Sequence, residues 1–197
     1  MANVIRVVRG QDMMVVTFDY QCGDCTPGQT VNINGRYFAI AEADENSVSV
    51  LTRYGGPLDL PEGTEVNMTG PLGKGFPVYD SWDAVIVCGG TAMGVGFNLL
   101  NYRASKGLRT WFVSYTRGSN PYTGAIHSLA GLKNIECSIN WDTKKDSRPE
   151  TPYSPLASSR FPEGTQVFVA GTKELVEACR QHAEQFGISP NNINLNY

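Results

Sequence analysis

Short apolar clusters rich in valine and isoleucine alternate with turn-forming residues over the first third of the chain. These clusters predict six strands, near residues 4–8, 13–19, 29–33, 36–42, 47–53 and 64–69. Asn34-Gly35 predicts a tight hairpin between two of them, because a type I′ turn needs positive φ at both central positions. The pattern is typical of a small antiparallel β-domain.

A different pattern follows residues 70–77, a segment with three glycines and two prolines. Beyond it, predicted strands alternate with helical segments, which favours parallel pairing with crossover helices. The strands are expected at residues 84–88, 109–114, 134–139, 166–170 and 192–195. A helix is expected from an N-cap at Thr172 to Gly187. Residues 142–160 show no periodicity and predict a long surface excursion. We therefore expect two domains, residues 1–76 and 77–197.

Composition narrows the classes of function. The formal net charge is −3, and no cluster of Lys and Arg predicts nucleic-acid binding. No apolar run is long enough for a membrane helix or a signal peptide, so we expect a soluble cytoplasmic protein without membrane partners. The two histidines leave little room for a metal site, and we expect none. In this context the five cysteines are expected to be thiols rather than a disulfide framework.

A glycine-rich turn carries the clearest candidate chemistry. Residues 83–100 form a buried strand, a turn from Gly89 to Gly94, and a helix. Without side chains at Gly89 and Gly90, a pyrophosphate can approach the backbone N–H groups and the positive end of the helix dipole. The alternative is that these glycines only allow tight packing of strand against helix. Glycine spacing alone leaves both interpretations open.

Several short motifs, in this order and spacing, resemble one family. They are Arg36-Tyr37-Phe38-Ala39, residues 70–76, Gly89-Gly90-Thr91, Val169-Ala170-Gly171-Thr172 and the final Tyr197. Together they are similar to the ferredoxin–NADP reductase superfamily, in which a flavin-binding β-barrel precedes a pyridine-nucleotide domain. The sequence of the 70–76 segment is especially similar to electron-transfer subunits of dihydroorotate dehydrogenase. Nothing in the chain resembles the iron–sulfur cysteine cluster of those subunits. The resemblance implies a six-stranded antiparallel barrel followed by a parallel α/β domain.

The resemblance also implies a flavin site on the fourth predicted strand. Arg36 would pair with a flavin phosphate, and Phe38, next to Tyr37 in the motif, would lie against the isoalloxazine ring. Ala39 would lie at the reacting edge of the flavin, with only its backbone N–H to offer. Tyr197 would stack on the flavin face until nicotinamide displaces it. The alternatives are a solvated arginine, an ordinary core phenylalanine and a frayed terminus.

The implied nucleotide site draws on two turns and a third segment. Its residues would be Gly89, Gly90, Thr91, Ala92, Met93, Gly171 and Thr172. Arg117 and Ser119 suit the 2′-phosphate of NADPH, with NADH as the alternative. The turn at Gly55-Gly56 stands where the family binds the flavin pyrophosphate, but it is too short and proline-bound for the usual helix. FMN is therefore as plausible as FAD.

Three functions remain open. The leading hypothesis is a flavin-dependent NAD(P)H oxidoreductase that passes electrons to a separate acceptor protein or subunit. The second is a weakened, reductase-like module that binds nucleotide or a protein partner without turnover. The third is a thiol-redox protein that acts through Cys22 and Cys25, a Cys-x-x-Cys in a loop. If this pair matters, an intersubunit metal or a regulatory disulfide is favoured over catalysis.

Overall fold

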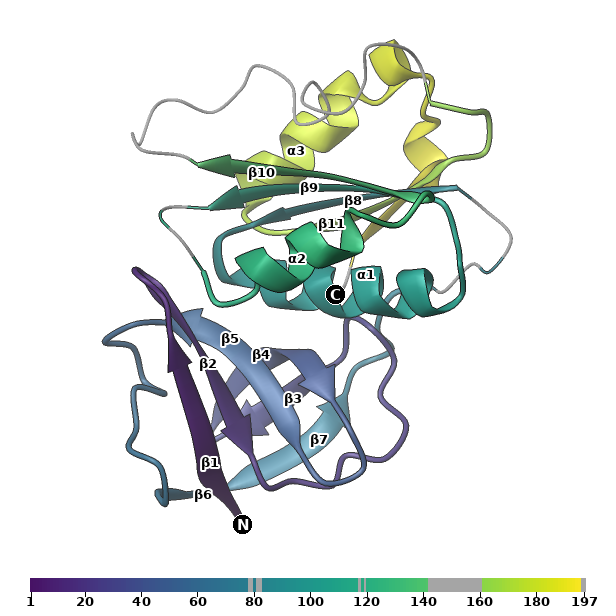
Figure 1. Cartoon of the computed structure of the whole chain (residues 1–197). Coiled ribbons are helices and arrows are strands. Elements are labelled where there is room, and N and C mark those ends of the chain that lie inside the picture. Colours follow the sequence, from purple (N-terminus) through teal and green to yellow (C-terminus); the bar gives the residue numbers. More distant parts are fainter. Residues whose placement is uncertain (78–79, 81–82, 117, 119, 142–160, 196–197) are drawn as a thin grey trace.

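The computed structural model describes residues 1–77, 80, 83–116, 118, 120–141 and 161–195. It contains two sheets with a helical layer between them (Figure 1). The predicted surface excursion at 142–160 lies outside the described residues.

The first sheet is antiparallel and curls into a nearly closed barrel (Figure 1). Its strands are β1 (Ala2–Arg9), β2 (Met13–Phe18), β3 (Thr30–Ile33), β4 (Arg36–Ala43), β5 (Val48–Arg53), β6 (Glu65–Val66) and β7 (Met68–Leu72), in the order β6-β1-β2-β5-β4-β3-β7. The prediction of a barrel is confirmed, with seven strands rather than six. The last predicted strand divides into β6 and β7, and β7 continues to Leu72, inside the predicted junction. The Asn34-Gly35 turn has the predicted positive φ at both residues.

The second sheet is parallel throughout, as predicted. Its strands are β8 (Ala84–Gly89), β9 (Thr110–Thr116), β10 (Ile135–Trp141), β11 (Gln166–Ala170) and β12 (Ile193–Leu195), in the order β10-β9-β8-β11-β12. The helices α1 (Met93–Ser105) and α2 (Thr123–Leu129) cover the face toward the barrel, and α3 (Lys173–His182) covers the other (Figure 1). The described residues also form three 3₁₀ turns: η1 (Gly90–Ala92), η2 (Glu184–Phe186) and η3 (Pro190–Asn192).

The predicted C-terminal helix is confirmed in its capping. The Thr172 hydroxyl accepts a hydrogen bond from the Leu175 N–H, and Gly187 adopts the left-handed conformation after η2. The helix itself ends at His182, and the remaining residues tighten into the 3₁₀ turn.

Strand β2 is buried on both of its faces. Met14, Val16 and Phe18 point into the barrel core, whereas Met13 and Val15 belong to a second apolar cluster shared with the parallel sheet. Ala41 of β4 and Leu51 of β5 join that second cluster. We call this shared cluster the domain interface; from the other side it contains Met93, Val95 and Phe97 of α1.

Two glycines allow α1 to pack tightly on both sides. A Cβ at Gly94 would lie 2.9 Å from the Cβ of Leu51 and 3.1 Å from that of Ala41, both in the barrel. A Cβ at Gly96 would lie 2.8 Å from the Cys88 sulfur in the parallel sheet. Both glycines therefore have packing roles, and Gly94 brings the helix onto the barrel.

One hydrogen bond crosses the domain interface from a buried ring. The Tyr122 hydroxyl donates to Glu42 Oε2 in β4 at 2.9 Å, and its ring stacks on Phe97 of α1 at 4.2 Å. Burial, together with the Glu42 carboxylate, raises the pKa of Tyr122. Tyr122, at the start of α2, therefore contacts both α1 and β4.

The same substitution at two helical glycines should have opposite effects. Gly→Ala within a helix normally stabilises by about 1 kcal/mol. Gly124 in α2 has no atom within 4 Å of a new Cβ, so Gly124→Ala should show this gain. Gly94→Ala should instead lower the free energy of unfolding by about 1–3 kcal/mol, because both opposing Cβ atoms are fixed to backbone. Urea unfolding measures both. Stabilisation by both substitutions would contradict the tight docking of α1.

Stability at alkaline pH should depend on Tyr122. Because its folded pKa lies above the unfolded value of about 10, its contribution is fully present below that pH and lost above it. Tyr122→Phe should therefore flatten the fall in unfolding free energy between about pH 10.5 and 11.5, by roughly 1 kcal/mol per pH unit. The other buried phenols and thiols titrate in both proteins, so the difference in slope isolates Tyr122. Equal slopes would contradict the assignment.

Candidate functional site

The order of the parallel strands places a topological switch point between β8 and β11, and we call the edge of the sheet beyond these two strands the crevice. After β8 the chain builds outward on one side through β9 and β10, and it returns to build β11 and β12 on the other. In open parallel sheets, ligands bind at such a switch point, beyond the carboxyl ends of the strands. Gly89 ends β8 and Gly171 follows β11, and a Cβ at Gly171 would lie 3.4 Å from the Gly89 nitrogen. The two predicted nucleotide turns therefore meet at this crevice.

The turn after β8 presents backbone to the crevice at Gly90. Gly90 has a φ of +61°, which favours glycine, and no atom lies within 4 Å of the position that a Cβ would take there. In this described part of the chain, no side chain caps η1 or α1, and neither first turn carries an acidic residue. The first N–H groups of a helix have no partner within the helix. The turn at Gly90 and Thr91 therefore fits an anionic group.

The other residues predicted for the nucleotide site have different surroundings. The Leu175 Cδ2 of α3 would lie 3.1 Å from a Cβ at Gly89 and 2.8 Å from one at Gly171, so one leucine covers both glycines. Met93 is fully buried in the domain interface. Of these glycines, only Gly90 therefore has open space at the position of a Cβ, while Gly89 and Gly171 lie under Leu175. Leu175 was missed because its position on the apolar face of the predicted helix showed only that it packs on the sheet.

Strand β4 carries the predicted flavin motif to the domain interface. Arg36 and Tyr37 are exposed, with 70% of Tyr37 accessible, and Phe38 is half-buried against the barrel core. Ala39 is half-buried and packs against the domain interface, as does Ala92 of η1. The structure thus brings the end of the flavin motif and the nucleotide turn to the same apolar layer.

In the turn after β5, the Asp59 carboxylate already accepts a backbone N–H. The Gly55 N–H donates to Asp59 Oδ2 at 3.1 Å, and Asp59 Oδ1 pairs with Arg9 at 3.1 Å. The antiparallel register of β4 and β5 places this turn at the Arg36 end of the strand pair. A carboxylate paired with Arg9 therefore lies where Gly55 and Gly56 were predicted to bind a flavin pyrophosphate. Asp59 was missed because its contact with Gly55 depends on how the turn closes.

Three of the predicted site residues, Arg117, Ser119 and Tyr197, lie outside the described residues. Within the described ranges, no three His, Cys, Asp or Glu side chains gather into a group that could hold a metal ion. None of the helices in those ranges is both long enough and apolar enough to cross a membrane.

The cysteine prediction needs a correction. Cys22 and Cys25 are joined by a disulfide, which corrects the expectation of five thiols and agrees with the alternative of a disulfide at this pair. The three-residue separation brings both sulfurs to one side of a loop, which Gly23 turns with a φ of +64°. Cys88 and Cys137 are thiols, as expected.

A barrel, an interface helix and a five-stranded parallel sheet with its crevice at β8 and β11 together define the fold of the ferredoxin–NADP reductase superfamily. Solved structures with this fold match nearly the whole chain. No protein-family model and no curated protein matches the sequence.

Three of these structures are a flavohemoglobin, a reductase and a dioxygenase domain. The flavohemoglobin of Malassezia yamatoensis, solved with bound FAD and heme, has a TM-score of 0.79 and 16% identity over 98% of this chain and 58% of its own. The cytochrome P450 reductase of Amycolatopsis has a TM-score of 0.83 and 19% identity, over 99% of this chain and 68% of its own. The FAD/NAD-binding domain of nitric oxide dioxygenase from Vibrio cholerae has a TM-score of 0.81 and 12% identity, over 98% of this chain and 96% of its own. At these identities the likeness concerns the fold.

A new negative charge at the turn should separate helix stability from nucleotide binding. Thr91→Asp places a carboxylate at the start of α1, where it should stabilise the helix by about 0.3–1 kcal/mol. The same charge should repel a phosphate and weaken NADPH binding by at least about tenfold. Calorimetric titration measures the affinity. Ala125→Asp, which adds the same charge to the exposed first turn of α2, should leave it unchanged. Equal affinities for the wild type and Thr91→Asp would exclude this turn as the phosphate site.

Proposed function

We propose that the chain is a flavin-dependent NAD(P)H oxidoreductase that passes electrons from a nicotinamide dinucleotide, through a flavin, to a separate acceptor protein or subunit. The docking of α1 on the barrel is the observation that carries this proposal. Because Gly94 approaches Ala41 and Leu51 so closely, the turn that begins α1 lies against strands β4 and β5. The nucleotide turn and the flavin motif therefore share one interface.

Each part of the site has a distinct role in this proposal. Gly90 and Thr91 bind the dinucleotide phosphates through backbone N–H groups. Arg36 binds the flavin phosphate; it has no ion-pair partner among the described residues. Ala39 follows Arg36 by three residues along the strand, a span of about 10 Å that an extended ribityl phosphate could follow. Ala39 then offers its backbone N–H to the ring, and Phe38 and Tyr37 border it. When both cofactors are bound, they supply the hydride chemistry.

The donors at the Arg36 end of β4 fit one phosphate better than two. Asp59 already accepts the Gly55 N–H and holds Arg9, so a second phosphate there would meet a carboxylate. We therefore propose that FMN binds at least as well as FAD. NADPH rather than NADH remains a prediction from Arg117 and Ser119.

The acceptor is proposed to be a separate redox protein. The solved structures with this fold include a cytochrome P450 reductase and a ferredoxin reductase of carbazole 1,9a-dioxygenase, whose names describe transfer to another protein. This chain spans 68% and 65% of those two chains. That likeness supports a redox partner for this chain without identifying it.

Two features of the proposed flavin site favour a second function. A module that binds nucleotide or a protein partner without turnover would need no flavin. Ala39 packs into the domain interface and Asp59 fills the second anion position, and both features favour this alternative. Flavin binding separates the two functions.

Titration of the flavin-free protein with FMN and FAD tests the proposal. We expect FMN to bind at least as tightly as FAD, and Asp59→Ala to improve FAD affinity at least about fivefold by freeing the Gly55 N–H and removing a charge. Glu45→Ala, in the exposed turn at the other end of β4 and β5, removes an equal charge and should change neither affinity. Quenching of flavin fluorescence measures each affinity.

The outcomes are distinct. Binding of neither flavin, with NADPH binding retained, would replace the reductase by the nucleotide-binding module. Much tighter binding of FAD than of FMN by the unaltered protein would contradict the argument from Asp59.

A further inference from the structure

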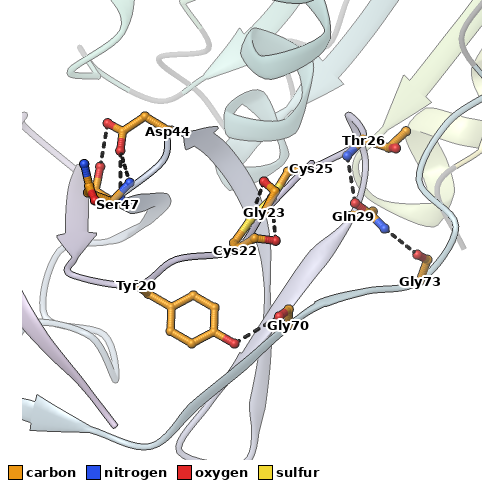
Figure 2. The surroundings of a disulfide bond; sticks show 11 residues. Tyr20, Cys22, Gly23, Cys25, Thr26, Gln29, Asp44, Ser47, Gly70 and Gly73 are labelled. Carbon is orange, nitrogen blue, oxygen red and sulfur yellow. Dashed lines mark hydrogen bonds between the residues drawn. A yellow bond between two sulfur atoms is a disulfide. The ribbon is translucent and has the colours of Figure 1, made fainter.

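The Cys22–Cys25 disulfide closes a small ring in the loop between β2 and β3 (Figure 2). Cys22 is only 6% exposed and packs with the barrel core, whereas Cys25 is half-buried. Gly23 and Asp24, between them, are exposed. Of the two cysteines, Cys25 is therefore the more exposed.

A ring this short does little for global stability. A disulfide stabilises mainly by restricting the unfolded chain, and the effect grows with the number of residues enclosed. Here the sequence separation is three. Burial raises the pKa of the Cys137 thiol to about 11 and also raises the pKa of the Cys88 thiol, which disfavours the reactive thiolate at both. The effect of the pair must therefore be sought in its own loop.

That loop is hydrogen-bonded to the linker that follows β7, residues 73–77. The Phe76 N–H donates to the Pro27 carbonyl at 2.7 Å, and Gln29 Nε2 donates to the Gly73 carbonyl at 2.9 Å (Figure 2 shows the Gln29 contact). Gln29 also accepts the Thr26 N–H at 2.7 Å. The disulfide ring therefore lies at the start of a segment whose last residues are hydrogen-bonded to the linker.

The approach of the two segments is close enough to require glycine on both. A Cβ at Gly28 would lie 2.7 Å from the Phe76 nitrogen, and one at Gly75 would lie 2.7 Å from the Pro27 carbonyl oxygen. Both glycines also have positive φ. Small changes in the path of residues 25–28 must therefore move the linker or break its hydrogen bonds.

The linker in turn reaches the crevice of the parallel sheet. Phe76 is 2% exposed in the domain interface, and its ring meets Phe168 of β11 edge to face at 5.4 Å. Strand β11 leads directly to Gly171, which faces Gly89. A continuous set of contacts therefore joins Cys25 to the proposed nucleotide turn.

We propose that Cys22–Cys25 is a thiol–disulfide exchange site for a dithiol reductant, and that its redox state sets how firmly the linker is held between the two domains. A thiolate of the reductant attacks the Cys25 sulfur, the bond to Cys22 breaks, and Cys22 leaves and takes a proton. The second thiol of the reductant then attacks its own sulfur in the mixed disulfide and releases Cys25. Two electrons and two protons enter the pair, and the reductant becomes a disulfide. This site does not depend on flavin binding.

Hydrogen exchange compares the two states in one protein. The oxidised protein and the same protein reduced with dithiothreitol are followed by mass spectrometry. Reduction should speed exchange at the Phe76 amide at least about tenfold, because its acceptor lies in the released loop. Peptides of β8 should not change. The Cys22→Ser/Cys25→Ser variant should resemble the reduced protein and ignore dithiothreitol. Equal exchange at Phe76 in the two states of the wild type would overturn the proposal.

Alkylation of single variants tests which sulfur reacts. Iodoacetamide should label Cys25 in Cys22→Ser at least about tenfold faster than Cys22 in Cys25→Ser, because Cys25 is the more exposed of the two. Peptide mass spectrometry locates the label and excludes the other cysteines. Equal rates, or faster labelling of Cys22, would contradict the route through Cys25. A pair that dithiothreitol cannot reduce in the folded protein would contradict the exchange site itself.

Discussion

The approach of α1 to the barrel is the contact on which the rest of the structure depends. At Gly94 the helix backbone comes close enough that even a methyl group would collide with Ala41 and Leu51. Since Gly96 brings the opposite side of the helix against β8, the two sheets are held at fixed positions on either side of α1. The Tyr122 hydrogen bond to Glu42 and the contact of Phe76 with Phe168 reinforce this arrangement at two further places.

This docking divides the glycine-rich run into two kinds of residue. Gly94 and Gly96 serve packing, while Gly90 has open space and a conformation suited to glycine. In the sequence, packing and phosphate binding were alternatives for Gly89 and Gly90. The structure assigns packing to Gly94 and Gly96 and leaves Gly90 accessible for phosphate. The helix dipole is thereby directed to the crevice at β8 and β11, beside strand β4.

Much of the fold could be predicted because its signals are local. Alternating apolar residues, Asn34-Gly35 and the Thr172 cap each act through neighbours in the sequence. Burial of β2 on two faces could not be predicted from alternation, although the unbroken apolar run Met13–Val16 is typical of such strands. The disulfide, Leu175 over the two glycines and Asp59 at Gly55 depend on how loops close, which no periodicity records. The family resemblance predicted the fold correctly, while the assigned site residues stay predictions.

The central claim is that a hydride passes directly from the nicotinamide to the flavin across the domain interface. A kinetic isotope effect tests it. The flavin-loaded protein is mixed without oxygen with NADPH, or with NADPH deuterated at the transferred position, and the loss of flavin colour is followed by stopped flow. If the nucleotide turn and β4 hold their cofactors at one interface, the flavin should bleach in a single phase that deuterium slows. Bound flavin that NADPH and NADH both leave oxidised would contradict the account.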